Sequence, residues 1–281
     1  MDDRFRSYSF VDRIASVDPC KRIEGSYAIP EGLPSFPMPL VAEATGQLAA
    51  WAAGQALDFR FQPVAGIAGR IEILSNVSPG QTLDLEVDIE RVDEEAISYL
   101  GTARVDGEPV LRLFDCLGPM IGMDQFDDPD RVRSRYELLL GDGAEPGGFP
   151  GIPHIGLTRT GGEEGEWVSA GFTVPQSAPF FGDHFPLRPV FPGTLMLDVH
   201  MRLGLELVNE TFPPADGLRW TIPSMTRMKM RAFIPPGSEL ETMIHFHRRD
   251  GETPEVQVNT RREKRSISGG RATFAIEEIP S

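Results

Sequence analysis

The feature that most constrains the fold of this chain is an internal repeat of one helix and several strands. Each half contains an apolar helix, beginning near Pro39 in "PLVAEATGQLAAWAAGQAL" and near Gly193 in "GTLMLDVHMRLGLELV". Because both segments are apolar almost all the way round, each is predicted to lie buried with a sheet wrapped about it. Each helix carries one carboxylate near its first turn, Glu43 in the first half and Asp198 in the second.

Strand patterns follow the two helices in the same order. The segments "ILSNVSPGQTLDLEVDIERV" and "MKMRAFIPPGSELETMIHFHRR" each contain a strand, a Pro-Gly turn and a second strand. The halves are spaced by 157 residues from Pro79 to Pro236 and by 155 residues from Glu43 to Asp198. This near-constant spacing indicates a duplicated unit.

The boundary between the halves is predicted in the glycine- and proline-rich stretch "LLGDGAEPGGFPGIP". We predict an N-terminal domain, a linker and a C-terminal domain over residues 1–140, 141–153 and 154–281. Upstream of the helices the spacing falls to 145 residues, from Pro30 to Pro175, so the first half lacks about ten residues. The missing residues correspond to "GDHFPLRPVF", which leaves the motif histidine, His184, in one copy.

The composition excludes several classes of protein. With 281 residues, 40% hydrophobic and 25% charged, the chain is typical of one or two globular domains. A net charge of -15 argues against general nucleic-acid binding, because a phosphate backbone would be repelled. Two cysteines are too few for a disulfide scaffold or a cysteine zinc site. No basic, apolar leader and no membrane span are found, so a cytoplasmic location is expected.

The second half resembles the hot-dog fold 3-hydroxyacyl-ACP dehydratases in its G/D-H-F-P, P-V-x-P-G and acidic motif. The matching residues are Asp183, His184, Phe185, Pro186, Pro189, Val190, Pro192, Gly193 and Asp198. The first half is similar to the same family in "FVDRI" and in "EATGQ", which begins at Glu43 and ends at Gln47. The resemblance implies an α+β double hot-dog, with two antiparallel sheets each wrapped around a long central helix.

The same resemblance implies a composite site. In this family the histidine comes from one unit and the acid from the helix of its partner, which pairs His184 with Glu43. Dehydration requires a base for the C2 proton, an acid for the departing hydroxyl and donors to the thioester oxygen. We expect His184 to be the base, Glu43 the acid and the backbone N–H of Gly193 the donor. Gln47, one helical turn after Glu43, is expected to orient it.

The carboxylate of the second helix is expected to have a different role. Asp198 lies one helical turn before Arg202, and a nearby guanidinium favours the ionised form of a carboxyl. Asp198 is therefore expected to be a poor proton donor in a structural ion pair, with a direct site of His184 and Asp198 as the alternative. The residues expected to contact the substrate are Phe181, Phe185 and Pro192.

Other histidines and basic clusters suggest weaker hypotheses. His245 and His247 point the same way on a predicted strand, but no third ligand is near in the sequence, so no metal site is expected. The pieces "RVRSR" from Arg131 and "RREKR" from Arg261 are expected to be solvated strand ends, with docking of acidic acyl carrier protein as the alternative. Three further candidates for such docking are Arg227, Lys229 and Arg231.

The predicted activity is dehydration of a 3-hydroxyacyl thioester to the trans-2-enoyl thioester in fatty-acid, polyketide-like or specialised lipid synthesis. The acyl group would be carried on acyl carrier protein or on CoA, and no metal or redox cofactor is implied. A ketosynthase partner or a homo-oligomer is also considered. The alternatives are a thioesterase, a 2,3-to-3,4 double-bond isomerase and a non-catalytic acyl-binding or assembly subunit of a larger synthase. The histidine missing from the first half, and Arg202, where the family usually has glutamine, make the non-catalytic alternative credible.

Overall fold

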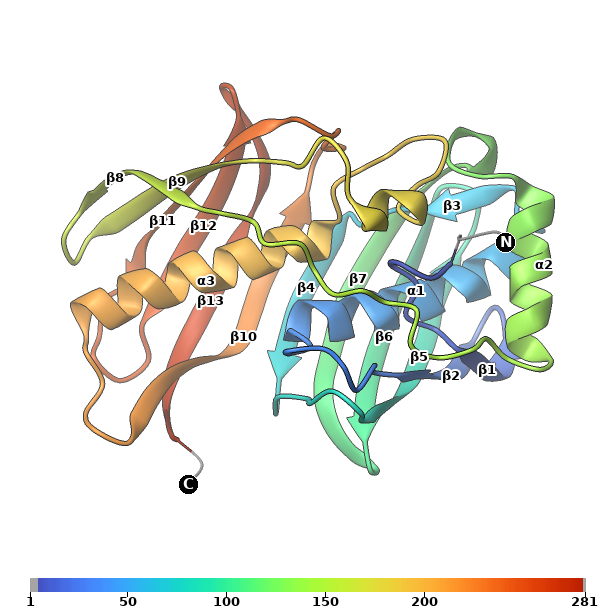
Figure 1. Ribbon diagram of the computed structural model, residues 1–281, viewed down its shortest axis with the longest axis horizontal. Helices are drawn as coiled ribbons and strands as arrows, with labels where there is room; N and C mark the ends of the chain where they lie inside the picture. Colours follow the sequence, from blue (N-terminus) through green and yellow to red (C-terminus); the bar gives the residue numbers. More distant parts are fainter. Residues whose placement is uncertain (1–4, 280–281) are drawn as a thin grey trace.

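The computed structural model describes residues 5–279 and contains one antiparallel sheet against which two long helices pack (Figure 1). The elements of the first half are β1 (Arg13–Asp18), β2 (Arg22–Ala28), α1 (Met38–Ala56), β3 (Phe61–Pro63), β4 (Ile67–Ile73), β5 (Thr82–Val92), β6 (Ala96–Val105), β7 (Glu108–Gly122), η1 (Met123–Gln125) and α2 (Pro129–Leu140). Those of the second half are β8 (Thr158–Glu163), β9 (Trp167–Thr173), η2 (Pro179–Gly182), α3 (Gly193–Thr211), β10 (Leu218–Met230), β11 (Glu239–Arg248), β12 (Glu255–Arg262) and β13 (Arg265–Glu278).

The strand order is the same in both halves when each is followed inward from its outer edge. The first half runs β1-β2-β5-β6-β7-β4 and the second runs β8-β9-β11-β12-β13-β10. β4 and β10 pair with each other, with Ile71 opposite Met225, and join the halves. The prediction of two separate sheets is therefore wrong. Pairing these inner strands satisfies backbone groups that two separate sheets would each leave at an exposed edge.

Both Pro-Gly turns connect strands that are not neighbours in the sheet. β4 pairs with β7 and β10, whereas β5, which follows the first turn, pairs with β2 and β6. Gly80 and Gly237 have φ values of 86° and 73°, a backbone conformation that favours glycine. The turns therefore carry the chain across the sheet.

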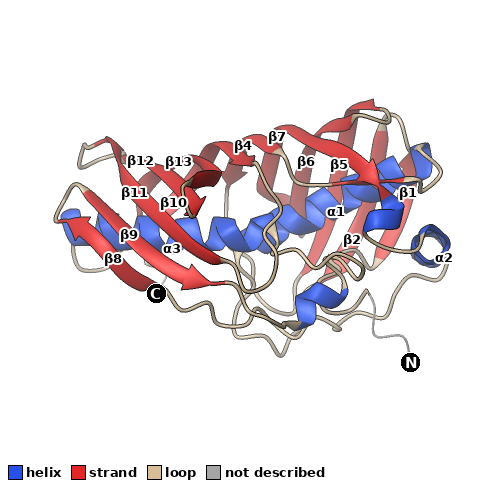
Figure 2. Ribbon diagram, turned by 90° about the horizontal axis from the view of Figure 1, so that it is seen from above, coloured by secondary structure: helices blue, strands red, loops and turns tan. Residues whose placement is uncertain are grey.

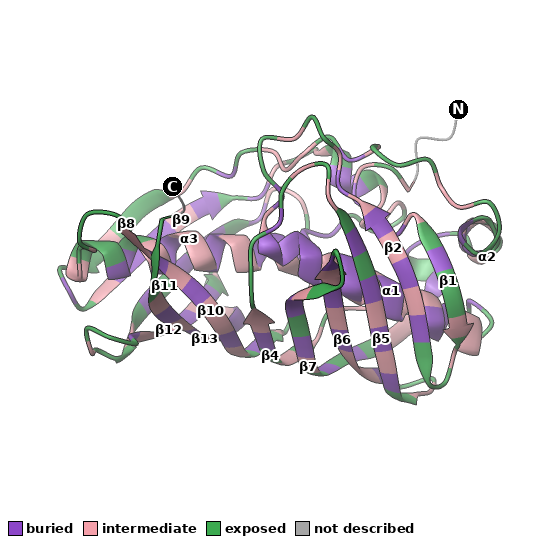
Figure 3. Ribbon diagram, turned by 90° about the horizontal axis from the view of Figure 1, so that it is seen from below, coloured by how far each residue is buried: buried purple, intermediate pink, exposed green. Residues whose placement is uncertain are grey.

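The helices lie together on one face of the sheet, begin near the middle of the molecule and run outward in opposite directions (Figures 1 and 2). α1 is rich in alanine and is largely buried, as Figure 3 shows. Strand residues facing the helices alternate with outward-facing ones, as the burial pattern of β5 illustrates. Because the helices start side by side, the N-terminal part of each contributes side chains to the same region.

The connection between the halves contains α2 and a long irregular segment. "RVRSR" lies in α2, so the prediction that it is a strand end is wrong. The helix begins at Pro129 and is capped by Asp128, whose side chain accepts from the N–H of Asp130. Residues 141–157 then cross beside α1 and α3 without a helix or strand (Figure 1). The domain limits at 140 and 154 stay predictions.

Among residues 5–279, no helix combines the length and the apolar character that a membrane crossing requires.

Candidate active site

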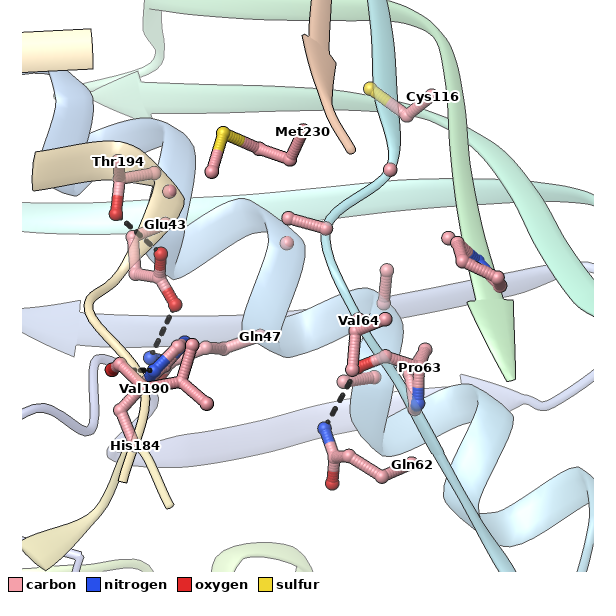
Figure 4. Close-up of a pocket in the computed structure, with 18 of the residues that line it drawn as sticks. Glu43, Gln47, Gln62, Pro63, Val64, Cys116, His184, Val190, Thr194 and Met230 are labelled. Atoms are coloured by element: carbon pink, nitrogen blue, oxygen red, sulfur yellow. Dashed lines mark hydrogen bonds between the residues drawn. The ribbon is translucent and has the colours of Figure 1, made fainter. Parts of the chain in front are cut away.

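A cavity of about 460 Å³ lies between the two halves of the molecule. Its walls come from α1, from residues 62–68 before and within β4, from the loop that carries the histidine motif, and from residues 228–233 at the end of β10. Figure 4 shows Glu43, Gln47, His184 and Thr194 at one side of this cavity. Most other side chains that line it are apolar.

The ring of His184 is fixed by its neighbours. Its Nδ1 lies 2.9 Å from the carbonyl oxygen of Val190, and the backbone N–H of Val190 donates to the carbonyl of His184 at 3.0 Å. Since a carbonyl only accepts, Nδ1 carries the hydrogen and the neutral ring keeps its lone pair on Nε2. Phe185 stacks on the ring at 4.3 Å and Tyr8 contacts it edge-on at 5.7 Å between centroids. The histidine therefore presents a basic nitrogen in a defined orientation.

The carboxyl group of Glu43 accepts a hydrogen bond on each oxygen. Gln47, one turn further along α1, donates to Oε1 at 3.0 Å. Thr194, the second residue of α3, donates to Oε2 at 2.6 Å. The N-terminal parts of the two helices are thus joined through this carboxyl group, which lines the cavity together with His184.

Gln47 connects Glu43 to the N-terminal segment. Its Nε2 also donates to the carbonyl of Tyr8 at 2.8 Å, and its Oε1 accepts from the backbone N–H of Phe10 at 2.8 Å. Both ends of the amide are used, so its orientation is determined. The expected role of Gln47 in orienting Glu43 depends on the hydrogen bond between them and stays a prediction.

Asp183 of the histidine motif holds the same N-terminal segment. Its carboxylate accepts backbone N–H groups of Phe5, Ser7 and Tyr8 at 2.6, 2.7 and 2.7 Å. Burial raises the pKa of Asp183, while these backbone donors act in the opposite direction. The residue next to the histidine thereby fixes the position of Tyr8.

The start of α3 places a backbone N–H at the cavity. Gly193 is the first residue of α3 and lines the cavity, and a Cβ added to it would lie 3.3 Å from Cγ of Met230. Of the three residues expected to contact substrate, Phe185 lines the cavity. Phe181 and Pro192 are buried and, within the part of the chain that the structure describes, are not among the lining residues.

Asp198 lies elsewhere, in the expected ion pair. Its Oδ2 is 3.0 Å from Nε of Arg202, which also donates to the carbonyl of Ile155 at 3.1 and 3.2 Å. Burial raises the pKa of Asp198, and Arg202 lowers it as expected but does not outweigh the burial, so the ion pair does not by itself make Asp198 a poor proton donor. Its exclusion from the site rests instead on position, since neither Asp198 nor Arg202 is among the described residues that line the cavity.

Two cavity residues were missed in the sequence. Thr194 directly follows the Pro-Gly of the histidine motif, which offers a local signal. Tyr8 lies in "RSYSF", where no spacing or composition marks it. His245 and His247 are exposed, and the described residues contain no group of three or more His, Cys, Asp or Glu side chains placed to hold a metal.

Comparisons with known proteins match this chain to dehydratases. Residues 161–271 match the ApeI-like family, described as ApeI dehydratase. The chain is 25% identical over 115 residues to the uncharacterized thioester dehydrase BH1850 of Halalkalibacterium halodurans, covering 40% of this chain and 74% of that protein. It is 30% identical over 105 residues to the 3-hydroxyacyl-[acyl-carrier-protein] dehydratase FabZ of Streptococcus pneumoniae, covering 37% of this chain and 73% of that protein. Matches to two further FabZ proteins span only 55% and 51% of their length.

A solved structure resembles nearly the whole chain. The 12:0-ACP thioesterase from Umbellularia californica is 14% identical, with a TM-score of 0.55, and the match covers 91% of this chain and 94% of that one. At this identity the likeness establishes the hot-dog fold alone.

Proposed function

Because the chain belongs to the hot-dog fold family of dehydratases and thioesterases, we propose that it removes water from a 3-hydroxyacyl thioester to give the trans-2-enoyl thioester. The observation that carries this proposal is the pairing of two groups on one cavity. His184, from the second half, offers a neutral ring with a free Nε2, and Glu43, from the first half, offers a carboxyl group. A base and an acid from different halves suit an elimination in which a proton and a hydroxyl leave neighbouring carbons.

In the proposed reaction Nε2 of His184 takes the C2 proton, and the electron pair of that C–H bond forms the double bond. The C3–O bond breaks as Glu43 protonates the departing hydroxyl, which leaves as water. The backbone N–H of Gly193, at the start of α3, would donate to the thioester oxygen as negative charge grows there. We propose that the apolar remainder of the cavity holds the acyl chain.

The two halves are proposed to derive from one duplicated hot-dog unit, which makes the chain a double hot-dog with one composite site. The mirrored strand order and the single histidine motif support this. The substrate would be delivered on the phosphopantetheine of acyl carrier protein or on CoA, without a metal or redox cofactor. Lys229 and Arg231 line the cavity and are the proposed contacts for an acidic carrier.

Hydrolysis of an acyl thioester is the second candidate, because a solved structure that matches nearly the full length is a thioesterase. It would need a water molecule directed at the thioester carbonyl instead of a proton removed from C2. The products separate the two: hydrolysis releases free acid and thiol, whereas dehydration leaves the thioester intact.

The test is incubation of the purified chain with 3-hydroxyacyl-ACP and 3-hydroxyacyl-CoA thioesters of several lengths, followed by intact mass. Loss of one water by the wild type and not by His184→Ala is expected. Release of free thiol would favour the thioesterase. Binding of acyl carrier without any mass change would overturn both reactions and favour a non-catalytic subunit.

A further inference from the structure

The two oxygens of Glu43 have different hydrogen-bond partners, which bears on where a proton is held. Gln47 uses one amide hydrogen on Oε1 of Glu43 and the other on the carbonyl of Tyr8, while its oxygen accepts from Phe10. The amide therefore has no freedom to turn. Oε1 keeps this N–H donor in both protonation states, whereas Oε2 faces a hydroxyl that can accept as well as donate, which favours Oε2 as the oxygen that carries the proton.

Oε2 contacts the first of two hydroxyl groups in series. Thr194 Oγ1 lies 2.6 Å from Oε2 of Glu43, and Tyr8 Oη lies 2.9 Å from Thr194 Oγ1. Each hydroxyl has one hydrogen and accepts as well. When Glu43 is ionised, Tyr8 donates to Thr194 and Thr194 donates to Oε2. When Oε2 is protonated, the chain reverses: Oε2 donates to Thr194 and Thr194 donates to Tyr8.

We propose that Thr194 and Tyr8 are positioning residues that form a reversible hydroxyl relay, which keeps Glu43 hydrogen-bonded in both of its protonation states. The reversal requires only rotation of the hydroxyl hydrogens about their C–O bonds, because the heavy atoms stay in place. In the reversed state the hydrogen of Tyr8 turns toward the cavity, which Tyr8 lines. The use of this relay in catalysis rests on the proposed function, but its hydrogen bonds do not.

The proton balance of the relay during dehydration is simple. The O–H of Oε2 turns from Thr194 to the departing hydroxyl and gives up its proton, so that the hydroxyl leaves as water. The hydroxyl hydrogen of Thr194 then turns to the ionised Oε2. Tyr8 then donates to Thr194, and the proton lost from Glu43 is matched by the one that His184 has taken from C2. The relay thus stabilises the carboxylate at the moment it forms.

Tyr8 is suited to hydrogen bonding and not to proton release. Burial raises the pKa of Tyr8 well above its usual value, and the charge of Glu43 raises it further. Its position is fixed from two sides, since Asp183 accepts its backbone N–H and Gln47 donates to its carbonyl. Tyr8 is 2% exposed, so its hydroxyl has little access to bulk water.

The test follows the titration of the Glu43 carboxyl carbon by NMR in the full chain labelled with carbon-13 glutamate. Glu43→Gln identifies the signal. Thr194→Val, which keeps the shape but removes the donor, is expected to move the titration midpoint up by about one pH unit or more. Thr194→Ser, which keeps the hydroxyl, is expected to have the wild-type midpoint. Tyr8→Phe is expected to move it up by less, because Tyr8 acts only through Thr194.

The double variant Tyr8→Phe/Thr194→Val separates a relay from two independent effects. If the two residues form a relay, the double variant should have the same titration midpoint as Thr194→Val, because removal of the Thr194 hydroxyl already disconnects Tyr8 from Glu43. Additive shifts, or an unchanged midpoint in Thr194→Val, would overturn the relay. The other charged groups on the cavity, which stay unchanged throughout, are Asp127, Asp183, His184, Lys229 and Arg231.

The relay and the proposed function fail in different ways. If the wild type removes no water from any thioester but the midpoints shift as expected, the relay stands and the dehydratase proposal falls. If the wild type is active and the midpoints do not shift, the relay falls alone. Should Thr194→Val fail to fold, Tyr8→Phe and Thr194→Ser in the same titration still test the relay, because only the first is expected to shift the midpoint.

Discussion

The two long helices carry a carboxylate at matching positions, yet the two carboxylates lie in different surroundings. Glu43 on α1 faces the cavity and accepts from a neutral amide and a hydroxyl. Asp198 on α3 faces Arg202, which in turn binds the carbonyl of Ile155 in the segment that connects the halves. Similar backbones therefore support a candidate acid in one half and an ion pair in the other.

The positions that follow each carboxylate differ in the same way. At the same 155-residue spacing, Gln47 corresponds to Arg202 and the buried Thr45 corresponds to the buried His200. Thr45 bonds the carbonyl of Val41 within its own helix, whereas His200 reaches Thr260 on β12. Glu43 and Gln47 of α1 line the cavity between the halves, whereas the matching positions of α3 make polar contacts that bind this helix to the connecting segment.

The largest expected effect is on the one histidine that the repeat does not duplicate. His184→Ala should lower the dehydration rate by about 10³-fold or more, because the base for the C2 proton is lost and the first half has no copy of this histidine. The measurement is kcat on the best thioester of the panel. Unfolding in urea with an unchanged midpoint would serve as the control for folding. Activity of His184→Ala close to that of the wild type would show that the molecule does not depend on one site built around His184.

The next effect compares the two carboxylates directly. Glu43→Gln should lower kcat by about 10²-fold, because the amide cannot protonate the departing hydroxyl. Asp198→Asn is the matched variant in the other helix and should change kcat only a few-fold. The reverse result, with a large loss in Asp198→Asn and normal turnover in Glu43→Gln, would assign the acid to the second half.

Much of this comparison was predictable from the sequence, and the reasons are local. The apolar helices at Pro39 and Gly193 and the pairing of Glu43 with Gln47 follow from composition and helical spacing. The β4–β10 pairing was not predicted, because edge strands carry no pattern that names their partner. Tyr8 was missed because its position depends on backbone contacts to Asp183, which is 175 residues away in sequence.

A third effect concerns stability and separates His200 from Thr45. Burial lowers the pKa of His200 to about 3, below the usual 6.5, so the unfolded chain binds a proton at this residue that the folded chain excludes. Stability is therefore lost as pH falls from about 6.5 toward 3. Between pH 6.5 and 4.5 this histidine should remove on the order of 2–3 kcal/mol from the free energy of unfolding.

Urea unfolding at both pH values checks this, with His200→Gln set against wild type. The variant should lose less stability on acidification than the wild type does. Thr45→Val, at the matching buried position of α1, should keep the wild-type dependence because no titrating group is removed. If His200→Gln and the wild type lost the same free energy of unfolding on acidification, the buried histidine would not be the cause of the pH dependence.

The smallest effect is expected at the ion pair itself. Arg202→Leu removes the partner of Asp198 and two hydrogen bonds to Ile155, and should lower the free energy of unfolding by about 1–2 kcal/mol, since both side chains are partly exposed. The pKa of Asp198 is already raised, so an ionised Asp198 costs stability as pH rises, and without Arg202 this cost should grow. Urea unfolding at pH 5 and pH 8 measures it.

Adding Asp198→Asn to Arg202→Leu should recover part of the loss at pH 8, because the carboxylate that lost its partner is then gone. Activity should stay within a few-fold of wild type in both variants, whereas Gln47→Leu, the matched change on α1, should lower kcat by disturbing Glu43 and the Tyr8 carbonyl. If Arg202→Leu instead lost activity as strongly as Gln47→Leu, the second helix would act on the chemistry, and the two halves would share the site more evenly than their contacts indicate.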